Sequence, residues 1–456
     1  MTAAIEMLLE VENPMQEDLQ KPMELNLQDA FSLAMQMHRH GNYDGAEMLY
    51  RKLLKAVPDD PDVLHFFGVL LHQRGDSNAA VDLIEKSILL DPVPAGPYNN
   101  LGNVLLEMER FAEATDAFQK SIARQPWHAD AHSNLGTVLK AQGQFDKANE
   151  AYLRAIEIDP DHAEAHNNYG NLLSSQGKVK EAIFYYSRAI TLVPHHPQAR
   201  KLLGVAYYSL GEIGAAANVF HQWTQDEPDN PIAHHMYAAC SGQNVPHRAS
   251  DAYIEQSFDI FAASFDTKLG SLNYRAPELT AAALAQACAA PAGRLSVLDA
   301  GCGTGLCGPW VAPYACRLVG VDLSSGMLQR ASARNVYDEL VKAELQNYLA
   351  GHANAFDVII SADTLVYFGA LDGVLNAAYQ SLKPNGLMVF TVEETVSEDA
   401  GYKINPSGRY NHGSSYVRAS MLSAGFEICA MDPAELRLEG GEPVSGLVVT
   451  GRKLGL

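Results

Sequence analysis

The chain has 456 residues, of which 47% are hydrophobic, and its 54 acidic and 33 basic residues give a formal net charge of −21. Such a surface repels phosphate backbones, which disfavours direct binding to nucleic acid. No run approaches the roughly 18 consecutive apolar residues of a membrane span. The first ten residues lack the basic region and cleavage site of a signal peptide, so we expect a cytoplasmic protein. The six cysteines form no CxxC pair, so neither a disulfide framework nor a metal site is expected.

Residues 1–26 are expected to form a segment that is partly helical or disordered, after which a repeat begins. Prolines recur every 34 residues, at positions 58, 92, 126, 160, 194 and 228. Twelve residues before each proline stands an alanine, and twenty-four before it stands a glycine or an alanine. Each unit is predicted to be a pair of antiparallel helices, in which the small residue of the first helix meets the alanine of the second. The units then stack, because one pair cannot bury its apolar face alone.

This pattern resembles the tetratricopeptide repeat. The resemblance implies an α-solenoid over residues 27–240, made of six repeats and a partial cap, with a concave groove that binds a protein or peptide. Asn100, Asn134 and Asn168 occupy the same place in three consecutive repeats, similar to the asparagine ladder of O-GlcNAc transferase repeats. Carboxamides donate and accept hydrogen bonds, so such a row can hold an extended peptide by its main chain. The alternative is that these asparagines are only solvated polar positions.

After a linker at residues 241–252, the pattern changes to that of an α/β domain at 253–456. Apolar strands alternate with amphipathic stretches, and the strands are expected at 295–300, 316–322, 356–362, 386–392, 426–431 and 445–451. This alternation predicts a mostly parallel sheet with helices on both faces. The last two strands read as a hairpin, so the final strand is expected to run antiparallel.

The segment VLDAGCGTG at 297–305 carries the first chemical signal. Asp299 ends the first expected strand, and the glycines that follow let the main chain approach a ligand closely. Asp322, at the tip of the second strand, suits the two hydroxyls of a ribose. The glycines also fit a dinucleotide fingerprint, but a carboxylate at Asp299 opposes a pyrophosphate and suits the cationic end of S-adenosylmethionine.

Together with GVDLSSGML at 320–328, this segment resembles the first two motifs of class I S-adenosylmethionine-dependent methyltransferases, in particular predicted bacterial ones that carry tetratricopeptide repeats. The resemblance implies a Rossmann-like domain that binds S-adenosyl-L-methionine. It places an acid against the adenine amine, here Glu344 with the Leu345 amide beside it. The cofactor-binding residues that we expect are Asp299, Gly301, Gly303, Gly305, Asp322, Leu323, Glu344, Leu345 and Ala362.

Residues near the fourth and fifth strands are candidates to contact the methyl acceptor. We expect catalytic roles for Asp363, Tyr367 and His412, with His412 as a general base. Arg409 and Tyr410 are expected to bind substrate, because polar loops at this place carry binding groups. The alternatives are that Asp363 only caps a helix and that Tyr367 is core.

Five residues before the first expected strand of the sheet are also considered for the site. Phe258, Phe261 and Phe265 stand at helical spacing and are expected to be packing residues rather than a lid. Tyr274 and Arg275 are further candidates to line the cleft.

The sequence therefore predicts S-adenosylmethionine-dependent methyl transfer to a protein or peptide recruited by the repeat groove. One alternative is a small-molecule methyltransferase whose repeats serve only assembly. Others are an NAD-linked oxidoreductase that uses the same glycines, or an inactive scaffold. No membrane contact is expected, and the oligomeric state stays open.

Overall fold

The computed structural model describes residues 8–11, 23–262, 265–395, 401–439 and 441–455. Its contacts divide the chain into two compact units, Met1–Leu202 and Leu203–Leu456. The division falls inside a helix of the repeat region, so the second unit contains the last repeat helices as well as the α/β domain. Within the described ranges, every helix is too short or too polar to cross a bilayer.

The described part of the segment 1–26 is extended. β1 (Leu8–Val11) pairs antiparallel with β2 (Met23–Asn26). The hydrogen bonds between these strands satisfy backbone N–H and C=O groups, which a helix would have satisfied within itself. The expectation of helix or disorder is therefore wrong for these residues, and the rest of the segment lies outside the described residues.

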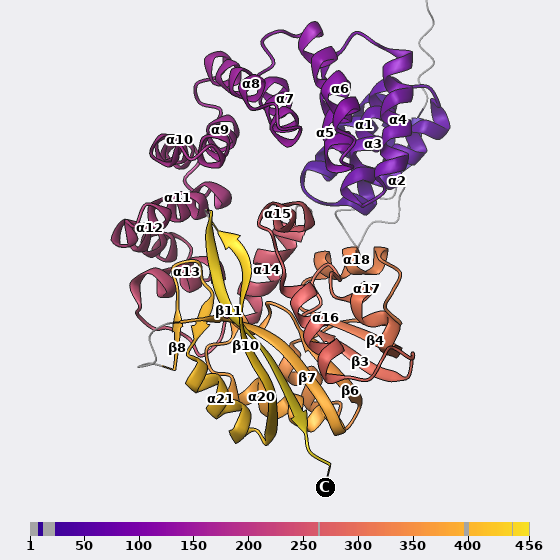
Figure 1. The fold of residues 1–456 in the computed structure, drawn as a ribbon. Coiled ribbons are helices and arrows are strands. Elements are labelled where there is room, and N and C mark those ends of the chain that lie inside the picture. The colour runs from indigo at the N-terminus through magenta and orange to yellow at the C-terminus, as the bar shows by residue number, and fades with distance from the viewer. Residues whose placement is uncertain (1–7, 12–22, 263–264, 396–400, 440, 456) are drawn as a thin grey trace, which may run out of the picture. The chain divides into compact units, whose positions relative to one another are not determined.

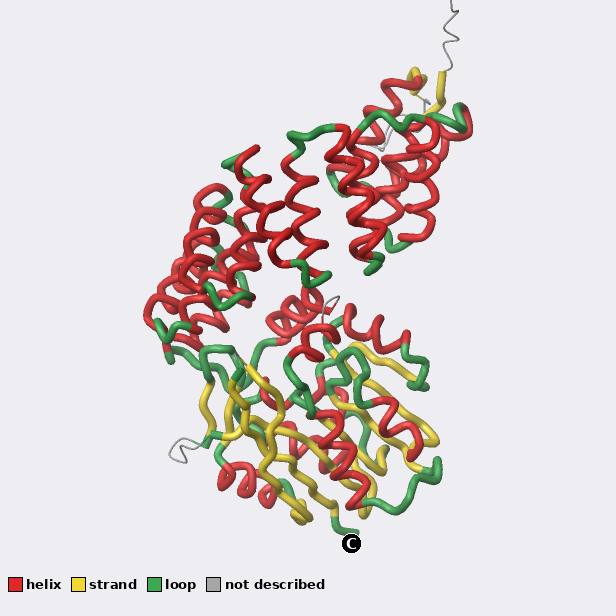
Figure 2. Tube along the Cα trace, turned by 45° about the horizontal axis from the view of Figure 1, so that its top comes forward, coloured by secondary structure: helices red, strands yellow, loops and turns green. Residues whose placement is uncertain are grey.

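The repeat region consists of consecutive helix pairs (Figure 1; red in Figure 2). They are α1 (Leu27–Arg39) and α2 (Tyr43–Ala56), α3 (Pro61–Gln73) and α4 (Ser77–Leu90), α5 (Ala95–Glu107) and α6 (Phe111–Arg124), α7 (Ala129–Ala141) and α8 (Phe145–Ile158), α9 (Ala163–Ser175) and α10 (Val179–Leu192), α11 (Pro197–Ser209) and α12 (Ile213–Asp226), followed by α13 (Pro231–Ser241). The helical solenoid is confirmed.

The predicted close approach of the paired helices is present, and the glycine of the first helix also meets a larger side chain. The alanine that recurs on each second helix is fully buried, as at Ala148, and a Cβ at Gly68 would lie 3.0 Å from the Ala80 carbonyl oxygen. In later repeats the atoms nearest to the glycine belong to an aromatic ring. A Cβ at Gly136 would lie 2.8 Å from the ring of Tyr152, and one at Gly170 would lie 2.7 Å from that of Tyr186. The ring projects further from the second helix than a methyl group does, so it is the ring that requires a residue without a side chain.

The second unit is built on a mostly parallel sheet, as predicted, with the order β10-β11-β7-β6-β3-β4-β5. The strands are β3 (Leu295–Ala300), β4 (Ala315–Asp322), β5 (Glu339–Lys342), β6 (Phe356–Ser361), β7 (Leu382–Glu394), β10 (Phe426–Glu439) and β11 (Glu442–Lys453). β11 runs antiparallel to both of its neighbours, β7 and β10. Two short strands, β8 (Tyr402–Ile404) and β9 (Tyr410–His412), were not predicted and pair beside β7.

Helices cover both faces of this sheet. They are α14 (Asp251–Phe261), α15 (Phe265–Ser271), α16 (Ala276–Ala287), α17 (Gly308–Val311), α18 (Ser325–Ala333), α19 (Leu345–Ala350), α20 (Asp372–Ser381) and α21 (Ser414–Ser423), with short 3-10 turns η2 (Ala312–Tyr314) and η3 (Leu365–Tyr367). Neighbouring strand residues point to opposite faces. Leu298 therefore belongs to one apolar core and Val297 to another on the other side. The carboxyl ends of β3, β4 and β6 then meet at one edge, where ligands of such sheets bind.

Candidate active site

The glycine turn after β3 adopts a left-handed backbone, with φ of +77° at Gly301 and +53° at Gly303. The Gly301 amide donates to the Val321 carbonyl at 2.9 Å. The Gly303 amide donates to Oδ2 of Asp322, also at 2.9 Å. The turn is thus fixed to the tip of β4, and a carboxylate stands at its edge.

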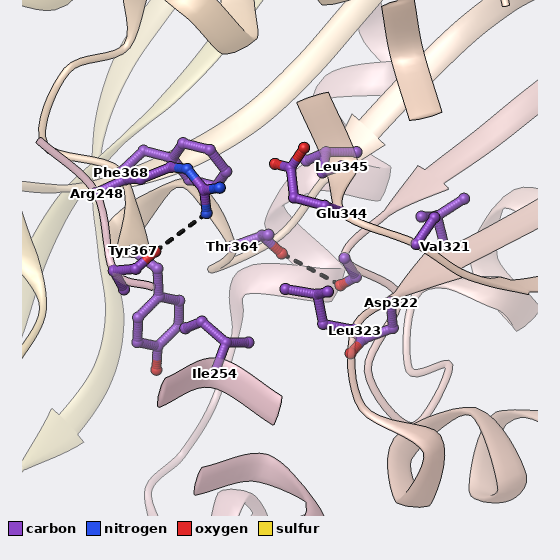
Figure 3. A pocket seen from close by; sticks show the side chains of 13 residues that line it. Arg248, Ile254, Val321, Asp322, Leu323, Glu344, Leu345, Thr364, Tyr367 and Phe368 are labelled. Atoms are coloured by element: carbon purple, nitrogen blue, oxygen red, sulfur yellow. Dashed lines mark hydrogen bonds between the residues drawn. The ribbon is translucent and has the colours of Figure 1, made fainter. Parts of the chain in front are cut away.

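A first cavity of about 60 Å³ lies beside this turn. It is lined by Gly301 and by residues at or just after the ends of β4 and β5, namely Asp322, Leu323, Glu344 and Leu345. Figure 3 shows Asp322 and Leu323 on one side and Arg248, Tyr367 and Phe368 on the other. The cavity therefore offers carboxylates along one wall, and aromatic groups with the Arg248 guanidinium along the other.

The two carboxylates of this cavity are both held by backbone amides. Asp322 also accepts from the Ser324 amide through Oδ1 at 2.9 Å, and burial raises its pKa despite these bonds. Glu344 caps α19 by accepting from the Gln346 amide at 3.0 Å and the Asn347 amide at 2.7 Å. A carboxylate has about four acceptor positions, so each group retains capacity for a ligand.

A second cavity of about 230 Å³ shares Gly301, Asp322, Thr364 and Tyr367 with the first. One side is apolar and aromatic, and includes Phe258, Phe261 and Phe265 from α14 and α15, together with Tyr274. These phenylalanines pack edge-on against one another, as expected, and their packed rings also form one wall of the cavity.

The other side of the second cavity carries a buried charge network. Arg437 is 2% exposed and donates to Asp363 at 2.6 Å, to Glu439 at 2.8 Å and to Glu393. Arg409 donates to Glu393 at 2.6 Å and also to Glu439. Two guanidinium groups thus meet three carboxylates, which compensates the cost of burying each charge.

Asp363 takes part in this network through an unusual backbone. Its φ is +58°, and its amide donates to the Thr391 hydroxyl at 2.8 Å. Asp363 is not a helix cap, because Thr364 is the N-cap of η3 and the Asp363 carboxylate bonds Arg437. Burial raises the pKa of its carboxyl, while Arg437 lowers it. Burial also raises the pKa of Tyr367 to about 12, so this phenol keeps its proton at neutral pH and can donate a hydrogen bond.

Of the residues predicted for the site, Asp299, Gly305, Tyr410, His412 and Arg275 line neither cavity. Asp299 is 1% exposed and bonds the Tyr337 hydroxyl, and neither cavity is lined by it. Gly305 packs beneath Tyr337, whose ring would lie 2.9 Å from an added Cβ. Both residues therefore lie against Tyr337 rather than along a cavity wall.

The structure also places Tyr410 and His412 away from both cavities. The Tyr410 hydroxyl donates to the Pro246 carbonyl at 2.7 Å. His412 is fully buried, and its Nε2 bonds the Phe368 carbonyl at 2.8 Å. Burial lowers its pKa to about 4. The prediction of His412 as a general base is therefore wrong, because β9 turns alternate side chains into the core.

Comparisons with known proteins agree with this geometry. A family model described as "Methyltransferase domain" matches residues 298–390. Four models of TPR or tetratricopeptide repeats match residues 39–100, 98–125, 136–177 and 173–240. The chain joins tetratricopeptide repeats to a methyltransferase domain.

Among curated relatives, human methyltransferase-like protein 27 is 35% identical over 152 residues, which cover 32% of this chain and 60% of that protein. A ubiquinone biosynthesis O-methyltransferase of Thiobacillus denitrificans is 26% identical over 191 residues, covering 36% and 81%. The crystal structure of MamA is 32% identical, covers 35% of this chain and 94% of that one, and gives a TM-score of 0.32. The chain spans less than two thirds of the length of the first curated relatives that it matches.

Sequence reasoning missed two residues at the charged end of the methyltransferase domain. Arg437 and Glu439 belong to β10, far along the chain from the glycine turn. An arginine in an otherwise strand-like stretch, ELRLEG at 435–440, is the one local signal, because a buried arginine requires carboxylate partners.

Proposed function

We propose that this protein transfers a methyl group from S-adenosylmethionine to a protein or peptide that the repeat groove recruits. The observation that supports it most is the pair of joined cavities. The smaller presents Asp322, Glu344 and apolar groups beside a glycine turn, as a nucleoside requires. The larger opens from the same turn and presents aromatic and charged groups to a second molecule.

The turn fits a ligand held against the main chain. A Cβ at Gly301 would lie 2.7 Å from the Thr364 Cβ, so the backbone reaches the cavity wall only because it lacks a side chain. Asp322 is positioned to accept hydrogen bonds from ribose hydroxyls, and Glu344 from an adenine amine. When bound, S-adenosylmethionine supplies an electrophilic methyl group on a sulfonium.

The larger cavity orients the acceptor. Its aromatic wall excludes water, and Tyr367 donates a hydrogen bond at neutral pH. Alignment of this kind is worth roughly 7–11 kcal/mol of a two-substrate barrier. Asp363 and Arg409, held by the charge network, set the polarity that an acceptor meets. Orientation of the acceptor in this way does not require a general base with a pKa near 7.

The repeats offer a continuous polar row for recruitment. Nδ2 of Asn100 lies 2.8 Å from Nε2 of His65 in the preceding repeat, and Nδ2 of Asn134 donates to Oδ1 of Asn99 at 3.2 Å. Each bond therefore joins two successive repeats. The three ladder asparagines, Asn100, Asn134 and Asn168, are only partly buried. They therefore retain exposed surface that a peptide main chain can contact.

Calorimetry with S-adenosylhomocysteine and with NAD tests the donor. The full chain is expected to bind the first and not the second, and Asp322→Asn is expected to weaken binding about 10-fold or more, as the loss of hydrogen bonds to a charged group would do. A chain that binds NAD and ignores S-adenosylhomocysteine is an oxidoreductase, and the proposal is then wrong.

Transfer of tritiated methyl groups into a cell extract tests the acceptor. Label is expected in the protein fraction, and a triple variant with Asn100, Asn134 and Asn168 changed to alanine is expected to lose it while keeping donor affinity. Label in the small-molecule fraction that the triple variant retains would instead favour the assembly role of the repeats. Donor binding with no transfer to either fraction would favour a scaffold.

A further inference from the structure

The last repeat shares one apolar core with the methyltransferase domain. Within the second unit, Phe220, Trp223 and Met236 of α12 and α13 are buried together with Tyr253 of α14. Ile254 and Tyr367, which line both cavities, pack against this same core. The walls of the site therefore rest directly on repeat helices.

A polar contact joins α13 to the loop that precedes β9. Nε2 of His235, which is 5% exposed, lies 2.8 Å from the Gly408 carbonyl. Burial lowers the pKa of His235, so the neutral ring donates Nε2–H to that carbonyl. The ring also stacks on Tyr253, with centroids 3.9 Å apart.

The loop fits closely on the repeat helix. Gly408 has φ +87°, and a Cβ there would lie 2.9 Å from the Tyr253 hydroxyl and 3.2 Å from the Met236 sulfur. Internal bonds close the loop, from the Asn405 amide to the Arg409 carbonyl at 2.8 Å and from the Gly408 amide to the Asn405 carbonyl at 2.9 Å. Arg409 follows at once, and it lines the larger cavity.

We infer that the last repeat is a part of the acceptor site, in which His235 is the positioning residue for Arg409. The inference rests on the proposed function. The 34-residue period places His235 at the position that Asn99, Ser133, Asn167 and Lys201 occupy in the preceding repeats. A second repeat residue, Tyr208, is close enough for Arg409 and Glu439 to influence its pKa.

The partner that this arrangement fits is a protein segment. A side chain of that segment would enter the larger cavity beside Arg409, within the second unit. The last repeat helices would then determine how the acceptor side chain is aligned.

Hydrogen exchange of the full chain tests the positioning role without needing an acceptor. His235→Ala is expected to speed exchange of the amides at 405–409 by about tenfold, the effect of losing one hydrogen bond. His235→Gln, which keeps an N–H donor, is expected to restore part of the protection. His234→Ala is the control, since His234 is exposed and its Nε2 bonds the Pro228 carbonyl in the turn before α13 rather than the loop at 405–409.

Two outcomes would overturn the inference. One is unchanged exchange at 405–409 in His235→Ala. The other is a rise that is equally large at the glycine turn 297–305, which would reveal general loosening. In the methyl-transfer assay, His235→Ala is expected to lower incorporation about tenfold while the dissociation constant for S-adenosylhomocysteine changes less than about twofold. A wild-type chain that binds no S-adenosylhomocysteine refutes the proposed function, whereas the exchange result still decides the role of His235.

Discussion

The hydroxyl of Tyr337 donates a 2.6 Å hydrogen bond to Oδ2 of Asp299, beneath the glycine turn. The Asp299 carboxyl is almost wholly buried, and burial raises its pKa to about 7 although the bond from Tyr337 opposes the rise. This pair supports the turn from inside the domain. Asp299 therefore supports the turn and lines neither cavity.

Stability should depend on pH through Asp299. The folded chain keeps a proton on this group up to about pH 7, whereas the unfolded chain releases it near pH 3.9. The free energy of unfolding is thus expected to fall as pH rises from about 4 to 7, by up to about 1.4 kcal/mol per pH unit. Urea unfolding at several pH values measures it.

Two variants separate this effect from other groups. Asp299→Asn should remove this part of the decline. Tyr337→Phe removes the bond that favours the charged carboxylate, so the decline should extend to higher pH. A Tyr337→Phe profile that shifts to lower pH would contradict the assignment.

Alanine substitutions at Gly301 and Gly303 can distinguish the cost of backbone strain from the cost of a steric clash. Both have positive φ, but an added Cβ meets Thr364 at Gly301 and nothing within 4 Å at Gly303. Gly303→Ala is expected to cost about 1 kcal/mol of unfolding free energy from strain alone, and Gly301→Ala clearly more. Equal costs in thermal unfolding would show that Thr364 moves aside freely.

Arg437 tests the buried charge network. Arg437→Ala leaves Glu393, which is 2% exposed, without one of its cations, and is expected to destabilise the fold by about 3–5 kcal/mol. Arg317→Ala is the control, because the Arg317–Glu339 pair is nearly half exposed and worth about 0–1 kcal/mol. Adding Glu393→Gln to Arg437→Ala should recover part of the loss. No recovery would mean that packing, not charge, dominates.

The same substitution should have opposite effects at two repeat glycines. Gly136→Ala drives a methyl group against the ring of Tyr152 and is expected to cost about 1–3 kcal/mol. Gly96→Ala meets nothing within 4 Å in α5, and is expected to be neutral or to stabilise by up to about 1 kcal/mol. Thermal unfolding compares the two, and a destabilised Gly96→Ala would refute the packing argument.

The sequence by itself determined the features that depend on local order. A 34-residue period fixed the repeat helices, because each unit places its small residues and proline at set positions along the chain. Alternation of apolar strands and helices fixed the parallel sheet. The pairing of a glycine turn with Asp322 also followed, because consecutive parallel strands end at the same edge.

Only the tertiary structure decided which side chains reach the cavities. His412 and Tyr410 lie on β9 and Asp299 on β3, and whether a strand residue faces a cavity or the core depends on what covers each face, which local sequence does not state. Arg437 bonds Asp363, which is 74 positions away in the chain, and His235 bonds Gly408, which is 173 positions away. Such contacts form because distant elements pack to bury apolar surface and pair their charges, so no short stretch of sequence records them.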